Sequence, residues 1–254
     1  MNSRLIVKIG SESLVNFQTS EKINALVQDV RTHFASTDIL LVTSGAVQFG
    51  REVLGVQKKD DEDRQVLAAV GWHHLMRAYA ERFGKVDIQV AGFLATHADI
   101  EDNIARANTF KRTIEATWQQ GILPISNEND PISTEEMIAL NRGADNDKNA
   151  LLLAQLFRAK SIIIITNTNG VYKNPEDPNS RISTLNGESL TPDFINSICG
   201  GKSSIGTGGM PSKLEIAREA AQLGIVTHIC DGIHSGVSHK NKGGTTIFPK
   251  NNIF

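Results

Sequence analysis

Six short apolar runs, each followed by small or polar residues, constrain the fold more than any other feature of the sequence. They are rich in Ile and Val, and they cover residues 5–9, 39–43, 88–94, 122–125, 162–166 and 226–229. Short apolar strands that alternate with longer helical patterns are typical of a parallel sheet covered on both faces. We therefore expect an α/β protein, a three-layer α/β/α sandwich with a mainly parallel central sheet.

The stretches between these runs have the spacing of helices. Ser20 and Glu21 provide an N-cap and an early acidic residue for a helix that runs to about Phe34. Apolar residues recur at helical spacing over 66–83, and 104–120 has a similar pattern. Because the loops after parallel strands gather along the carboxyl edge of the sheet, we expect the functional residues there.

Composition excludes several classes of protein. The chain has 254 residues and a formal net charge of −2, so we expect one domain and no nucleic-acid partner. With Cys199 and Cys230 alone, neither a disulfide framework nor a cysteine-rich zinc site is indicated. The N-terminus does not resemble a signal peptide, and no apolar stretch approaches the roughly 20 residues of a membrane span. We expect a cytoplasmic protein with no membrane association.

Two strand ends could hold an anion. Lys8 lies inside the first apolar run, directly before Gly10. A buried ammonium needs an anionic partner, so Lys8 either faces a phosphate or lies at an exposed edge or strand end. After the second run, Ser44 and Gly45 lead into a probable helix, where free N–H groups can bind an anion or where Ser44 is an ordinary N-cap.

Three further segments are rich in polar residues or glycine. Residues 126–131 and 143–149 gather amide and carboxylate side chains after strands, and they are either solvated turns or groups that hold an amine or order cations. Residues 203–213 form a glycine loop that runs into a helix carrying Lys213, with Pro211 suited to its start. Such a loop suits the phosphates of a nucleotide, although a mobile linker has the same composition. Neither a P-loop nor a dinucleotide fingerprint is complete.

In order along the chain, six segments resemble the amino acid kinase family, and most closely its glutamate 5-kinase branch. The segments are VKIGSESL (7–14), VTSGAV (42–47), NENDPIS (127–133), ADNDKNA (144–150), IIITNTNGVY (163–172) and GTGGMPSK (206–213). The resemblance implies one kinase domain over 1–254 with the carbamate-kinase-like fold. Its substrate side would be residues 1–155 and its nucleotide side residues 156–254.

The resemblance also implies roles for individual residues. Lys8 and Lys213 would contact the transferred phosphoryl group, and Asp147 would order them. The positions that match the acceptor site are Ser44, Gly45, Asp130 and Asn146. The positions that match the ATP site are Lys8, Thr166, Asn167, Thr207, Gly208, Gly209, Met210, Pro211, Ser212 and Lys213.

The implied reaction is the ATP-dependent and Mg²⁺-dependent phosphorylation of the γ-carboxylate of L-glutamate to glutamyl 5-phosphate, which opens proline biosynthesis. No protein metal ligands are expected, because nucleotide oxygens and water would hold most of the Mg²⁺. Proline as a feedback inhibitor and a homo-oligomer, dimer or tetramer, are also implied. The alternatives are a family member acting on another carboxylate or a carbamate, and a non-catalytic nucleotide-binding regulator.

The sequence departs from the family pattern at three places. Asn167 stands where the family usually has Asp, and the segment between Asp130 and Asn146 is longer than expected. The chain stops soon after a final strand at 243–247, so the resemblance implies a kinase-only form without the C-terminal PUA domain that many glutamate 5-kinases carry.

Overall fold

The computed structural model describes residues 2–14, 16–17, 20–56, 62–132, 146–199, 209–232 and 243–250. Its strands are β1 Ser3–Ile9, β2 Thr37–Thr43, β3 Val90–Ala95, β4 Leu123–Glu128, β5 Ser161–Ile165, β6 Val171–Tyr172, β7 Arg181–Ile182, β8 Thr184–Asn186, β9 Val226–Cys230 and β10 Thr245–Phe248. Its α-helices are α1 Glu21–His33, α2 Ala46–Leu54, α3 Glu62–Gly84, α4 His97–Glu101, α5 Ile104–Gln119, α7 Asn146–Phe157, α8 Pro192–Ile198 and α9 Met210–Gln222. Short 3₁₀-helices are η1 Ser11–Leu14, η2 Asp130–Ile132, η3 Pro178–Ser180 and η4 Gly187–Ser189.

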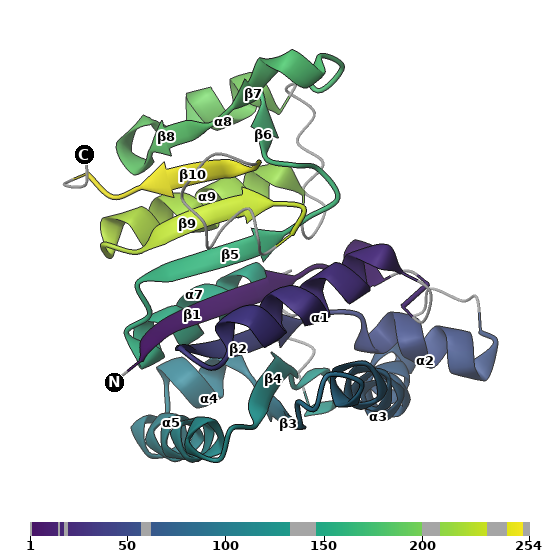
Figure 1. Ribbon diagram of the computed structural model, residues 1–254. Helices are drawn as coiled ribbons and strands as arrows, with labels where there is room; N and C mark the ends of the chain where they lie inside the picture. The colour runs from purple at the N-terminus through teal and green to yellow at the C-terminus, as the bar shows by residue number, and fades with distance from the viewer. Residues whose placement is uncertain are drawn as a thin grey trace.

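An 8-stranded sheet runs through the molecule in the order β3-β4-β2-β1-β5-β9-β10-β8 (Figure 1). The strands from β3 to β9 pair in parallel, whereas β10 is antiparallel to β9 and parallel to β8. Strand β1 lies between β2 and β5, with Lys8 opposite Val42 on one side and Ile164 on the other. The predicted mainly parallel sheet is therefore confirmed.

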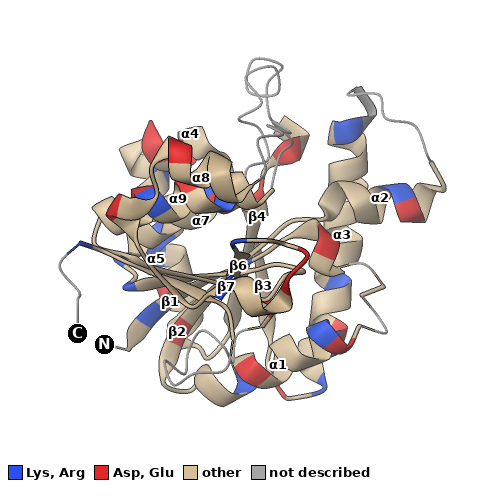
Figure 2. Cartoon of the chain, turned by 90° about the horizontal axis from the view of Figure 1, so that it is seen from above, with Lys and Arg blue, Asp and Glu red and all other residues tan. Residues whose placement is uncertain are grey.

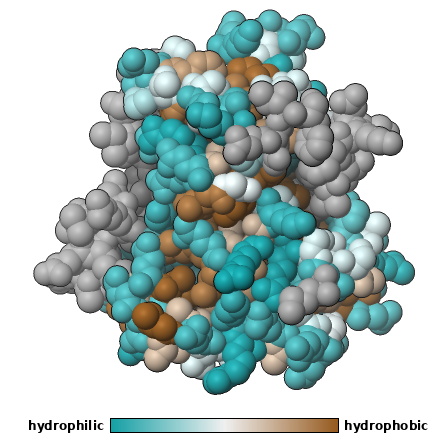
Figure 3. All heavy atoms as spheres, turned by 90° about the vertical axis from the view of Figure 1, so that its left-hand side faces the viewer, coloured by the Kyte–Doolittle hydropathy of each residue, from teal (hydrophilic) through white to brown (hydrophobic). Residues whose placement is uncertain are grey.

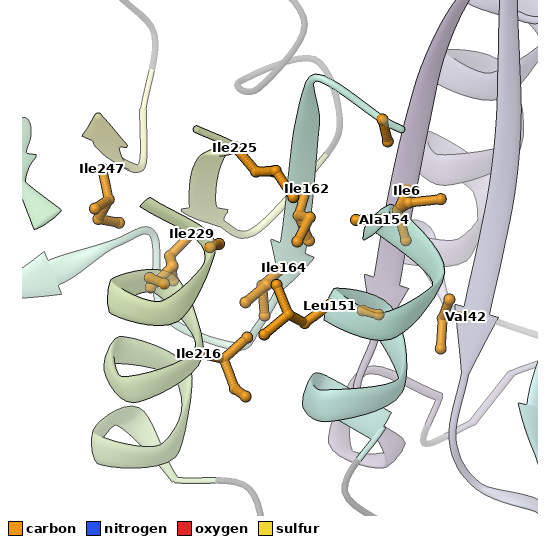
Figure 4. Packing of buried hydrophobic residues seen from close by; sticks show 14 of the residues in the cluster. Ile6, Val42, Leu151, Ala154, Ile162, Ile164, Ile216, Ile225, Ile229 and Ile247 are labelled. Carbon is orange, nitrogen blue, oxygen red and sulfur yellow. The ribbon is translucent and has the colours of Figure 1, made fainter. Parts of the chain in front are cut away.

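Side chains on the two faces of the sheet form two hydrophobic clusters, because successive strand residues point to opposite sides. Ile6 and Ile164 pack with α7 and α9 on one face (Figure 4), and α5 belongs to the same cluster. Val7 and Ile165 pack with α1 and α3 on the other face. Seen from above, the helices lie on both sides of the sheet and carry a mixture of acidic and basic residues (Figure 2). This arrangement is the predicted three-layer sandwich.

The predicted elements differ from the observed ones mainly at their ends. The third apolar run begins at Ile88, but β3 begins at Val90. Its first residues follow the turn that ends α3, where Asp87 is left-handed (φ 60°) and the Ile88 N–H donates to the Phe83 carbonyl at 3.1 Å. Val66, counted in the apolar pattern of α3, is 57% exposed.

The stretch from Asn167 to about Gly208 is rich in Asn, Asp, Gly, Pro and Ser, which predicts hairpins and long loops, but its described part contains more structure than that. Strands β6 and β7 form an antiparallel pair in which Val171 lies opposite Ile182, so the hairpin prediction is confirmed. Helix α8 was missed. Its signal is local: Thr191 caps the helix by accepting from the Phe194 N–H, and Pro192 stands in the first turn.

Helices α2 and α3 pack with their backbones in close contact at two glycines. A Cβ on Gly50 would lie 2.0 Å from the Leu67 carbonyl oxygen, and one on Gly71 would lie 1.7 Å from the Ala46 carbonyl oxygen. Neither position can hold a larger side chain without separating the helices. The two helices therefore behave as one packed unit beside the carboxyl edge of the sheet.

Figure 3 shows the side of the molecule opposite the carboxyl edge of the sheet, where β1 begins. Hydrophobic residues lie there in small groups between hydrophilic ones. Across the described ranges, none of the helices combines the length and the apolar character needed to cross a bilayer.

Candidate active site

Two lysines and one aspartate meet at the carboxyl edge of the sheet. Lys8 Nζ lies 2.6 Å from Asp147 Oδ1, and Lys213 Nζ lies 3.2 Å from Asp147 Oδ2. Their side chains are 5%, 6% and 0% exposed for Lys8, Lys213 and Asp147 respectively. One buried carboxylate thus binds two ammonium groups and leaves an excess positive charge, which suits an anionic ligand.

Each member of this trio comes from a different element. Lys8 is the penultimate residue of β1, in the interior of the sheet. Asp147 is in the first turn of α7, where an acidic side chain also interacts favourably with the helix dipole. Lys213 is in the first turns of α9, after Pro211, as predicted. Lys8 therefore does not lie at an exposed sheet edge, whereas its place next to the last residue of β1 agrees with the other alternative, a strand end.

Gly10 leaves open space beside the lysine. A Cβ added there would lie 3.7 Å from Lys8 Nζ and 4.0 Å from the Ile165 carbonyl oxygen. Without that methyl group, a ligand can approach both the ammonium group and the backbone of the turn. The strand end and the start of η1 therefore form one wall of the site.

The end of β2 brings Ser44 and Gly45 next to this wall. The Ser44 N–H donates to the Ile9 carbonyl at 3.2 Å, and the Thr43 hydroxyl lies 2.8 Å from the Tyr79 hydroxyl. Gly45 is the N-cap of α2 in a left-handed conformation (φ 98°), where a Cβ would lie 2.8 Å from Leu14 Cδ1. Among the residues that the structure describes, no side chain caps this helix start. The predicted turn into a helix is confirmed, and Ser44 is not its N-cap.

Asp130 and Asn146 are the other two predicted acceptor residues, and both are buried. Asp130 Oδ1 lies 3.8 Å from Arg64 Nη2. Burial raises the pKa of the Asp130 carboxyl, while Arg64 lowers it. Asn146 precedes Asp147, and its buried Oδ1 accepts no hydrogen bond from the part of the chain that the structure describes. Asn146 thus adjoins the trio directly, whereas the described ion pair of Asp130 is with Arg64 on α3.

The end of β5 supplies two predicted nucleotide residues. The Thr166 N–H donates to the Cys230 carbonyl at 2.8 Å, which fixes the strand end. The Asn167 side chain accepts from Lys22 Nζ at 3.1 Å and donates to Glu12 Oε2 at 3.2 Å. An amide can make both contacts, whereas a carboxylate at position 167 would face Glu12 with like charge.

The predicted glycine loop is described only in part. Gly209 is the N-cap of α9, and within the described part of the chain no side chain caps the helix. Met210 packs against the hydrophobic cluster. Pro211 is in the first turn, and Ser212 precedes Lys213. Thr207 and Gly208 lie outside the described residues, as does most of the long segment between Asp130 and Asn146.

Glu128 was not among the predicted site residues. It is the last residue of β4 and is 1% exposed. Burial raises the pKa of the Glu128 carboxyl to about 7; a hydrogen bond from Asn149 lowers it, and the charge of nearby Asp130 raises it further. The signal available in the sequence was the polar segment 126–131, whose amide and carboxylate side chains include Glu128.

A comparison with known proteins then identifies the family. The pattern of the amino acid kinase family matches residues 3–231. The chain belongs to this family. Kinases named glutamate 5-kinase are 34% identical over 259 residues in Chlorobaculum tepidum and 33% identical over 260 residues in Corynebacterium glutamicum. These alignments cover 95% and 98% of this kinase and 68% of each relative.

A solved structure of carbamate kinase from Giardia lamblia bound to AMP-PNP has the same fold, with a TM-score of 0.66 at 14% identity. The match covers 97% of this kinase and 98% of that chain. The carbamate-kinase-like fold of this family is therefore confirmed.

Proposed function

We propose that this kinase transfers the γ-phosphoryl group of ATP to the γ-carboxylate of L-glutamate, giving glutamyl 5-phosphate, the first step of proline biosynthesis. The observation that carries the proposal is the buried Lys8–Asp147–Lys213 trio, in a chain about one third identical to proteins named glutamate 5-kinase. The acceptor would lie on the side of residues 1–155 and the nucleotide on the side of residues 156–254.

The chemistry places few covalent demands on the protein. A carboxylate attacks a phosphoryl group, so the reactants repel each other, and the site must neutralise charge and hold the two in line. The Lys8 and Lys213 ammonium groups are the cations that neutralise the transferred group. Asp147 keeps them a fixed distance apart, since each of its oxygens faces one lysine.

We propose that the acceptor and the nucleotide bind at the same carboxyl edge of the sheet. We assign L-glutamate to Ser44, Gly45, Asp130 and Asn146, where the uncapped start of α2 suits a carboxylate and buried Asp130 suits the ammonium group. We assign ATP to Thr166, Asn167 and the start of α9 from Gly209 to Lys213, with Thr207 and Gly208 before it. Exclusion of water would protect the acyl phosphate from hydrolysis.

Magnesium fits this site as an ion carried by the nucleotide. Both oxygens of Asp147 already face lysines, and within the described ranges no three His, Cys, Asp or Glu side chains cluster as metal ligands. Mg²⁺ would add positive charge to the phosphates, with the nucleotide oxygens and water as its ligands. We further propose, on the family resemblance, a cytoplasmic homo-oligomer that proline inhibits.

The test is ADP release with Mg-ATP and a panel of glutamate, aspartate, N-acetylglutamate, carbamate and UMP, with hydroxylamine added to trap an acyl phosphate. Glutamate-dependent turnover with a trapped hydroxamate is expected. Lys213→Met should abolish it, whereas Lys148→Met, which removes a surface lysine paired with Glu219 on the neighbouring helix, should not. Turnover with another acceptor would show that the substrate is not glutamate. No ADP release with any of the five acceptors would favour a non-catalytic nucleotide-binding regulator.

A further inference from the structure

Glu128 connects the sheet to the first turn of α7 through a buried carboxyl group. Its Oε2 accepts a hydrogen bond from Asn149 Nδ2, two residues after Asp147. Its Oε1 is also buried, and it has no hydrogen-bond partner among the residues that the structure describes. Glu128 therefore holds the segment that carries Asn146 and Asp147 through Asn149.

Helix α4 presents two titratable side chains to Glu128. His97 Nε2 lies 3.6 Å from Glu128 Oε2. Asp99 also acts on the Glu128 charge, although it is paired with Arg106 at 2.6 Å. Because Asp99 is already paired with Arg106, His97 is the side chain on this helix whose charge can interact favourably with ionised Glu128.

The other elements around Glu128 carry charges that already have partners. Asp130, two residues further along the chain, faces Arg64 on α3 at 3.8 Å. On α7, Asp147 is paired with two lysines. Glu128 thus shares its side of the site with Asp130, and the two buried carboxyl groups repel each other when both are charged.

We propose that Glu128 is a positioning residue for the amino-acid acceptor, which holds the start of α7 through Asn149 and strengthens the pull of Asp130 on the acceptor's ammonium group. The inference rests on the proposed function, because it takes an α-amino acid as the acceptor. Glu128 acts through Asn149 and Asp130, and it does not touch the transferred phosphoryl group.

The charge of Glu128 then links acceptor binding to pH. With its pKa raised to about 7 by burial, Glu128 is mostly protonated at about pH 6 and mostly ionised at about pH 8. Ionised Glu128 adds negative charge beside Asp130, and an arriving ammonium group relieves the repulsion between the two carboxylates. The KM for glutamate should therefore fall about tenfold from pH 6 to pH 8, while the KM for ATP changes little.

Three variants separate this role from a structural one. Glu128→Gln keeps the size and an oxygen for Asn149 but cannot ionise, so its KM for glutamate should stay near the wild-type low-pH value at every pH. Asn149→Ala removes the hydrogen bond that lowers the Glu128 pKa, so the inflection should move to higher pH. His97→Gln tests the imidazole, whose ordinary pKa of about 6.5 lies in the same range, and the inflection should persist.

The experiment is steady-state kinetics of the full chain and these variants over that pH range, varying glutamate and ATP separately. Alongside it, a carbon-13 NMR titration follows the Glu128 carboxyl in protein without substrate. An inflection that survives in Glu128→Gln, or vanishes in His97→Gln, would overturn the inference while leaving glutamate turnover intact. Wild type that turns over no glutamate would overturn the proposed function and this inference together.

Discussion

Replacing Asp147 by Asn tests whether the charges of the trio depend on one another. The variant keeps the size of the side chain but removes the carboxylate that Lys8 and Lys213 share. The Asn oxygen can accept from one lysine, but its NH₂ group then faces the other, donor against donor. Both lysines remain buried, so neither can recover its hydration without a local rearrangement.

The size of the effect follows from the distances. At an effective dielectric constant of about 20, each ammonium–carboxylate pair about 3 Å apart attracts by about 5 kcal/mol, and desolvation offsets much of this. Removing one partner of a buried pair costs about 3–5 kcal/mol, which is a large part of the stability of a typical domain. Asp147→Asn should lower the free energy of unfolding by about that amount.

The assay is urea unfolding followed by circular dichroism, with linear extrapolation to water. The matched control is Glu219→Gln, which removes the Lys148–Glu219 pair at 2.9 Å between the same two helices. Those side chains are 34% and 41% exposed, so the control should cost less than about 1 kcal/mol. Adding Lys8→Met to Asp147→Asn removes one unpaired cation and should restore part of the loss. Equal, small losses for Asp147→Asn and Glu219→Gln would refute the reasoning.

Three further outcomes are expected. Gly71→Ala places a methyl group 1.7 Å from the Ala46 carbonyl and should cost at least about 1–3 kcal/mol in urea unfolding, whereas a loss below about 0.5 kcal/mol would contradict the close helix contact. Asn167→Asp should raise the KM for ATP severalfold, because the new carboxylate is repelled by Glu12. Adding Glu12→Gln should reverse this rise in KM. A KM that stays high in the double variant would exclude repulsion from Glu12 as the cause. Folding raises the Glu128 pKa from 4.5 to about 7, so between these pH values the folded protein holds a proton that the unfolded chain has lost. The free energy of unfolding should therefore fall by up to about 3 kcal/mol as the pH rises from 4.5 to about 7. Glu128→Gln should flatten this pH dependence in urea unfolding measured at each pH.

Much of the fold could be predicted from the sequence because each apolar run carries its own evidence. The interior strands are buried on both faces, so their Ile and Val runs are nearly continuous, and Ser20 and Pro211 mark helix starts by local chemistry. The start of β3 was not predictable in this way, because Ile88 is buried against α3 without belonging to a strand. Hydrophobicity reports burial, and it does not report backbone pairing.

The candidate site was predicted in part for a similar reason. Lys8 stands out as a charge inside an apolar run, and Lys213 follows a glycine loop. Their convergence on Asp147 depends on contacts between distant segments, and only the family resemblance pointed to it. Glu128 lies in the polar segment 126–131 that the sequence singled out, but its contact with Asn149 depends on which residues become neighbours after folding, and so does the Asn167–Glu12 contact.

The convergence of Lys8 and Lys213 on Asp147 also sets an order of events during synthesis. Lys8 leaves the ribosome with the first strand, but α9 follows only after most of the chain has been made. Domains fold as the chain emerges from its N-terminus, so a nascent chain that stops before α9 carries Asp147 with one lysine. Such an incomplete chain lacks one of the two lysines that we propose bind the transferred phosphoryl group. The proposed site is therefore complete only when nearly all of the chain has been made.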